Sequence, residues 1–203
     1  MEPAVVELPS VTAGEPTPVT WDLTNTFGPV AVSGQGGPLG SAAISRPTIG
    51  NHEVLTYQVE VPAGATRFDV RIGNTSDLAA DLDLFVRRSG VLVGQSADGD
   101  SEEAVSLINP APGVYTIEVD GYSVPAGSTE FDYRDVFYSA ALGEISAAST
   151  AVTLANGASA TISGSVTAEA APAAGRQLFG EMVVVTDEGA VVGRGNVSIG
   201  SVS

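Results

Sequence analysis

Apolar and polar residues alternate with a period of two along most of the chain. Leu55, Tyr57 and Val59 share one face of an expected strand, and polar residues occupy the other face. The same pattern recurs in three further segments, at residues 67–72, 81–86 and 115–120. Turns rich in Pro, Gly and Asn separate these segments. Such short strands are typical of β-sandwiches and jelly rolls, so we predict an all-β fold.

The two ends of the chain predict a second, discontinuous domain. Residues 1–46 hold about two strands, one of them around Trp21, which is too little for an independent core. Residues 140–203 hold about five more, and seven strands make an immunoglobulin-like sandwich. We predict that 1–46 together with 140–203 form one immunoglobulin- or fibronectin-type sandwich with Trp21 in its core. Residues 47–139 then form an inserted jelly-roll-like β-sandwich, and the glycine-rich stretch 33–38 is a flexible connection.

The composition excludes several classes of partner. The chain has 24 acidic residues against 8 basic ones, all of them Arg, for a net charge of −16. This field repels phosphate groups, so we expect no binding to nucleic acid or to anionic membranes. No run of 18 apolar residues occurs, so no membrane-spanning helix is predicted. The N-terminus lacks the features of a signal peptide, which favours either a cytoplasmic protein or a piece of a longer secreted chain.

Catalytic residue types are scarce. The chain has no Cys and no Lys, and its one imidazole, His52, lies in an expected exposed loop. Asp81 and Asp83 lie roughly 6–7 Å apart on one strand face, a spacing that glycosidase chemistry could use. However, an acidic face opposite Leu82 and Leu84 is the ordinary solvent side of a sandwich strand. We therefore predict no enzymatic activity, with a hydrolase based on this pair as a remote alternative.

The acidic segment 98–103 (Asp-Gly-Asp-Ser-Glu-Glu) suggests a cation site. It starts like a calcium loop but lacks the continuation of an EF-hand. A two-residue hairpin expected at Ser89-Gly90 would bring this segment back towards Asp81 and Asp83. The candidate calcium ligands are Asp81, Asp83, Asp98 and Asp100, with Glu102 from the same loop. The alternative is a solvated acidic surface without a metal.

Aromatic residues gather between positions 115 and 138. The group consists of Tyr115, Tyr122, Phe131, Tyr133, Phe137 and Tyr138. We expect most of them in the core, but alternation forces some outward. An exposed Tyr there could contact an insoluble protein or a polysaccharide.

Four motifs follow one another in the middle of the chain. They are Tyr57–Ala65 (YQVEVPAGA), Asp81–Val86 (DLDLFV), Gly99–Glu103 (GDSEE) and Pro112–Val119 (PGVYTIEV). In this order they resemble the bacterial pre-peptidase C-terminal domain, over roughly residues 47–139. The resemblance implies a jelly-roll-like sandwich of the kind found behind the catalytic domains of secreted peptidases.

The flanking segments 19–25 (VTWDLTN) and 152–161 (VTLANGASAT) resemble the fibronectin- or immunoglobulin-like region that ends large subtilisin-like serine proteases. The resemblance implies a secreted, extracellular, non-catalytic accessory region that aids substrate attachment, stability or processing. Its partner would be the protease catalytic domain of the same parent chain. None of the catalytic motifs of subtilisins is present, so no catalytic residue is carried over. The alternative is a stand-alone extracellular adhesin or a carbohydrate- or protein-binding module.

Overall fold

The computed structural model describes residues 1–147 and 150–203. The described residues form strands β1 to β18 and one short 3₁₀-helix, η1 (Ala140–Leu142), so the all-β prediction is confirmed. Among the described residues, no helix is long and apolar enough to cross a membrane. The chain divides into two compact units, Ala42–Ser139 and Met1–Ser41 with Ala140–Ser203. The boundary after Ser41 falls within β4.

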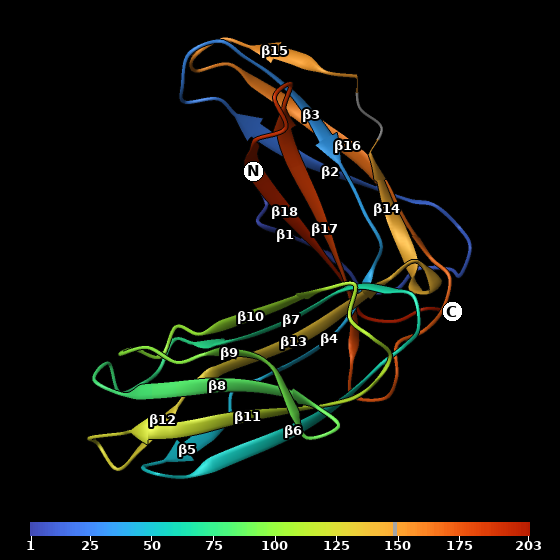
Figure 1. Cartoon of the computed structure of the whole chain (residues 1–203). Coiled ribbons are helices and arrows are strands. Elements are labelled where there is room, and N and C mark those ends of the chain that lie inside the picture. The colour runs from blue at the N-terminus through green and yellow to red at the C-terminus, as the bar shows by residue number, and fades with distance from the viewer. Residues whose placement is uncertain (148–149) are drawn as a thin grey trace. The chain divides into compact units, whose positions relative to one another are not determined.

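The strands of the unit Ala42–Ser139 form a four-stranded sheet and part of a second, longer sheet (Figure 1). In the first sheet the order is β6 (Val54–Val61), β11 (Gly113–Ser123), β8 (Asp81–Arg88) and β9 (Val91–Ser96). In the second it is β4 (Gly40–Ser45), β13 (Asp132–Ser139), β7 (Ala65–Gly73) and β10 (Ala104–Ile108). A small pair, β5 (Thr48–Gly50) with β12 (Ser128–Glu130), completes the unit.

The core of this unit lies between the inner faces of the two sheets. Along β8 the alternation is strict, and Leu82, Leu84 and Val86 are fully buried. Aromatic rings join the sheets. The ring of Tyr57 stacks on that of Tyr133 at 4.0 Å between centroids, and the rings of Phe68 and Tyr115 lie 5.2 Å apart.

The hairpin expected between β8 and β9 is present. Ser89 and Gly90 both have positive φ, 51° and 80°, as a type I′ turn requires. The turn sends β9 back along β8 in antiparallel register, with Leu84 opposite Ser96. The loop that follows β9 therefore returns to the end of the sandwich where β8 begins.

In the other unit, strands from both ends of the chain pair with each other. One sheet has the order β14 (Gly143–Ala147), β16 (Ser159–Ala168) and β2 (Thr17–Thr24), and Trp21 of β2 lies opposite Ile162 of β16. The facing strands are β1 (Val5–Leu8), β18 (Val191–Ile199), β17 (Gln177–Thr186), β3 (Val30–Gln35) and β15 (Val152–Leu154). The pair β1–β18 is parallel, whereas β17–β18 and β17–β3 are antiparallel.

Trp21 lies in the core of this second unit, as the sequence predicts. It is 1% exposed and belongs to one apolar cluster that draws on both chain segments, including Val19, Ile162 and Met182. A Cβ placed at Gly195 would overlap the indole ring. The indole therefore packs directly on the backbone of β18, which only glycine permits.

The glycine-rich stretch 33–38 is not the flexible connection that the sequence predicted. Strand β3 runs through it to Gln35 and pairs with β17 and β15. A Cβ at Gly34 would lie 3.0 Å from Cγ2 of Ile162, and one at Gly36 would overlap the Ile145 carbonyl. These glycines serve close packing between neighbouring strands, which composition alone does not distinguish from a linker.

Candidate functional site: an acidic end of the sandwich

The first candidate site lies where β8 begins and the loop between β9 and β10 passes over it. The Ser101 hydroxyl donates a hydrogen bond to the Ala80 carbonyl at 2.6 Å. The Leu82 amide donates to the Asp100 carbonyl at 3.3 Å. These bonds hold the acidic loop against the first residues of β8, to which the β8–β9 hairpin returns the chain.

Short-range hydrogen bonds shape the loop. The Asp98 carboxylate accepts from the Asp100 amide at 3.2 Å, and the Asp100 carboxylate accepts from the Glu102 amide at 2.8 Å. Each is an Asx-type turn, in which an Asp side chain bonds the backbone two residues on. The two turns in succession curl the loop tightly.

Glu103 is the buried member of the cluster. It is 2% exposed, and its carboxylate accepts hydrogen bonds from the Ser96 hydroxyl and from the Asp98 amide, the latter at 3.1 Å. One carboxylate oxygen each from Asp98, Asp100 and Glu103 lies within 4.8 Å of the other two. Three oxygens at such separations are compatible with one hard cation between them.

The carboxylates of β8 approach this cluster from the strand. Burial raises the pKa of Asp83 above its ordinary value of 3.8, and the negative charges of Asp81, Asp120, Glu103 and Asp98 raise it further. Asp83 also lies directly opposite Asp120 of β11. Oδ1 of Asp81 is buried and has no hydrogen-bond partner among the described residues. A buried carboxylate oxygen without a donor is costly unless something positive is supplied.

Two of the five expected ligands, Asp98 and Asp100, meet at the site, Asp83 lies within electrostatic reach of them, and Glu102 lies elsewhere. The structure brings Asp98 and Asp100 together with Glu103, a residue that the sequence analysis did not select. Glu103 precedes β10, where Val105 is buried, so the period of two turns Glu103 inward and Glu102 the other way. Extending the alternation back from Val105 would have identified it.

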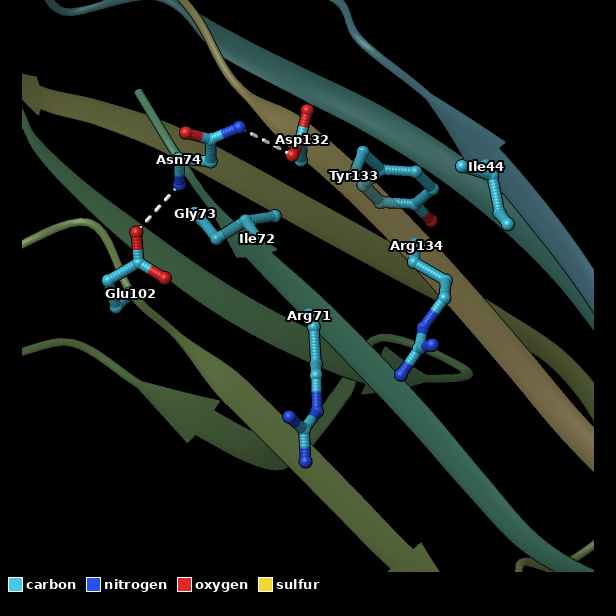
Figure 2. A pocket seen from close by; sticks show the side chains of 9 residues that line it. All are labelled: Ile44, Arg71, Ile72, Gly73, Asn74, Glu102, Asp132, Tyr133 and Arg134. Carbon is cyan, nitrogen blue, oxygen red and sulfur yellow. Dashed lines mark hydrogen bonds between the residues drawn. The ribbon is translucent and has the colours of Figure 1, made fainter. Parts of the chain in front are cut away.

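Glu102 instead borders a second candidate site, a cavity of about 420 Å³ in the same unit. Its lining comprises Ile44, Arg71, Ile72, Gly73, Asn74, Glu102, Asp132, Tyr133 and Arg134 (Figure 2). The Asn74 amide donates to Oε1 of Glu102 at 2.6 Å, and the Asn74 side chain donates to Oδ2 of Asp132 at 2.8 Å. Hydrogen bonds from Asn74 and Arg46 lower the pKa of Asp132 below its ordinary value.

The remaining candidates stay apart from both sites. His52 is exposed in the turn between β5 and β6, with φ 60°. Of the six aromatic residues between 115 and 138, Tyr122 is exposed (60%) and the others are buried. Tyr138 points to the opposite face of β13 from Phe137 but is covered by the Arg67 guanidinium, 4.2 Å from its ring centroid. The outward aromatic surface that alternation suggested is thus reduced to Tyr122.

Comparison with known proteins identifies the middle of the chain. Residues 53–121 match the family described as bacterial pre-peptidase C-terminal domain, which confirms the resemblance seen in the motifs. Pyrolysin of Pyrococcus furiosus is 36% identical over 107 residues, which make up 52% of this chain and 8% of pyrolysin. This chain therefore matches only a small part of that relative.

Two solved structures show weaker likeness. PliG of Aeromonas hydrophila, a periplasmic inhibitor of g-type lysozyme, is 19% identical over 48% of this chain and 86% of its own, with a TM-score of 0.37. A carbohydrate-binding module, CBM36, in complex with calcium and xylotriose is 19% identical over 58% of this chain and 98% of its own, with a TM-score of 0.29. Likeness of this degree carries no information on ligand or activity.

Proposed function

We propose that this chain is a non-catalytic accessory region of a secreted subtilisin-like serine protease, and that it aids substrate attachment, stability or processing. The observation that carries the proposal is the match of residues 53–121 to the pre-peptidase C-terminal domain. The match to 8% of the length of pyrolysin supports it, because an accessory region is a small part of a large protein. The partner would be the catalytic domain of the same parent chain, outside the cell.

The chemistry of the described residues agrees with a non-catalytic role. His52 is exposed in a turn, without the buried position beside a nucleophile that a Ser–His–Asp triad needs. Asp81 and Asp83 lie among further carboxylates, which repel one another. Their arrangement favours cation binding over acid–base chemistry on a sugar.

Two experiments test the accessory role. The first is to translate the open reading frame that contains this chain. The second is to sediment the purified chain with insoluble collagen, chitin or casein and to measure how much of it is retained on each polymer. The proposal expects a subtilisin-type domain in the same frame and saturable retention on at least one polymer. If the open reading frame encodes no protease and the chain still binds a polymer, the result would favour the alternative, a stand-alone adhesin or a carbohydrate- or protein-binding module. Substituting the exposed Tyr122 by Ser shows whether its ring takes part in retention.

We further propose that the acidic end of this sandwich binds calcium through Asp98, Asp100 and Glu103, with Asp81 and Asp83 beside them. The support is the approach of three carboxylate oxygens within 4.8 Å and the buried, unpartnered Oδ1 of Asp81. Calcium takes 6–8 oxygen ligands in flexible geometry, and a curled loop of carboxylates suits it better than the stricter octahedron of magnesium.

Calcium binding is measured by thermal unfolding in millimolar calcium against EDTA at matched ionic strength. A cation that binds only the folded state at a hundred times Kd stabilises it by about 2.7 kcal/mol, which raises Tm by several degrees. Asp100→Asn, which keeps an acceptor for the Glu102 amide, should lose most of this rise. Asp187→Asn, at an exposed turn position of the other unit, should keep it. An equal response to magnesium, or no loss in Asp100→Asn, would leave a solvated acidic surface.

A further inference from the structure

The cavity beside Glu102 has two arginines at one end. Arg71 of β7 and Arg134 of β13 lie directly opposite each other in antiparallel register. Side chains at opposite positions leave the same face of a sheet, with Cβ atoms about 4.5–5.5 Å apart. Figure 2 shows both side chains extending to the same side, away from the group formed by Asn74, Glu102 and Asp132.

Arg71 is an exposed cation without a partner. It makes no hydrogen bond or ion pair with any residue in the described part of the chain. By contrast, Arg46, Arg87 and Arg194 are each bonded to a carboxylate. Such a cation is unexpected in a chain with three times as many acidic as basic residues. Arg134, directly opposite, has an interaction of its own, so the guanidinium available to a ligand is that of Arg71.

The carboxylates of the same cavity are already engaged by other groups. Glu102 accepts from the Asn74 amide, and Asp132 accepts from Arg46 and from the Asn74 side chain. The cavity is therefore polarised, with hydrogen-bond acceptors at one end and guanidinium donors at the other. Ile44, which is 56% exposed, supplies an apolar wall.

We propose that this cavity binds the C-terminal carboxylate of a peptide. A guanidinium can hold a carboxylate by two parallel N–H···O bonds, and Arg71 has all its donors available. Ile44 would contact an apolar final side chain, and the acceptors at the far end suit the peptide's N–H groups. About 420 Å³ accommodates a chain end of this size. A uronic acid would also bind Arg71 but offers no apolar group to Ile44.

This inference goes beyond the accessory role, because the cavity would bind the same group in a stand-alone module. It is tested by NMR titration of the ¹⁵N-labelled full chain with acetyl-Gly-Gly-Leu as the free acid and as the C-terminal amide. The free acid should shift the amide signals of Ile72, Gly73 and Asn74 saturably, and the C-terminal amide should not. Arg71→Ala should weaken binding about tenfold or more, since it removes a charge-assisted hydrogen bond.

Two controls separate this site from general electrostatics. Arg88→Ala removes the same charge from the same unit, where Arg88 bonds the Pro112 carbonyl, and it should leave peptide affinity unchanged. The unliganded Arg71→Ala variant should melt no lower than the parent, whereas a lower Tm would assign Arg71 a structural role. Equal shifts with acid and amide, preference for galacturonate over the peptide, or equal effects of both substitutions would overturn the proposal.

Discussion

Asp83 shows how one charge couples the acidic end to pH. Because its pKa is raised in the folded state, folding favours the protonated form. The associated stability is present below the ordinary value of 3.8 and is lost as pH rises through the raised value. At neutral pH without a divalent cation, the Asp83 charge therefore works against folding.

Asp83→Asn is accordingly expected to raise Tm in EDTA at pH 7, because it removes a charge surrounded by other carboxylates. The gain should shrink as pH falls towards 3.8, where the parent takes up its proton. In millimolar calcium the variant should have the lower Tm, since it lacks a carboxylate at the proposed site. The measurement is the Tm of parent and variant at pH 7 and pH 4, in EDTA and in calcium. A variant with a lower Tm than the parent in EDTA at pH 7 would contradict the claim that the Asp83 charge is unfavourable in the folded state.

Trp21 packs directly on the backbone at Gly195 in the second unit. Gly195→Ala should destabilise this unit by about 1–3 kcal/mol, because a buried indole cannot move away from the new methyl group without strain. Trp21 is the chain's one tryptophan, so urea unfolding followed by its fluorescence measures the effect directly. Gly28→Ala meets no atom within 4 Å and should be close to neutral. Similar effects from both substitutions would argue against the packing described.

At the scale of elements, the alternation of apolar and polar residues predicted most strands, and the density of acidic residues indicated the acidic site. The alternation did not predict β3. A glycine-rich sequence is the same whether its glycines allow a neighbouring strand to approach or form a linker. The sequence analysis also missed Glu103, because the motif around it looks uniformly solvated. The burial of Glu103 depends on where the loop lies against β8, which is a tertiary contact.

The pairing of β2 with β16 and of β1 with β18 leads to a prediction about deletion. Removing residues 1–40 should unfold the segment 140–203, because it exposes the apolar faces around Ile162 and Val184. Residues 42–139 expressed alone serve as the control and should melt cooperatively. If the truncated chain keeps the far-UV spectrum and melting temperature of the parent, the proposal of one discontinuous domain is wrong.

For the whole molecule, a net charge of −16 keeps the chain soluble and unattractive to polyanions while it concentrates carboxylates that a cation can bridge. The proposed calcium site would suit the proposed extracellular setting. Together with the family match at residues 53–121, the charge of the chain agrees with the proposed accessory role.

The proposed accessory role is tested most directly by deleting this region from the proposed parent protease and comparing the hydrolysis of two substrates. We predict that kcat/KM for a soluble peptide stays within about twofold, because no catalytic group is removed. Hydrolysis of an insoluble protein should fall about tenfold or more, since the second attachment point is lost. Loss of peptide hydrolysis to background would mean that the region contributes to the chemistry itself. Unchanged rates on both substrates, with an unchanged thermal half-life, would contradict any accessory role.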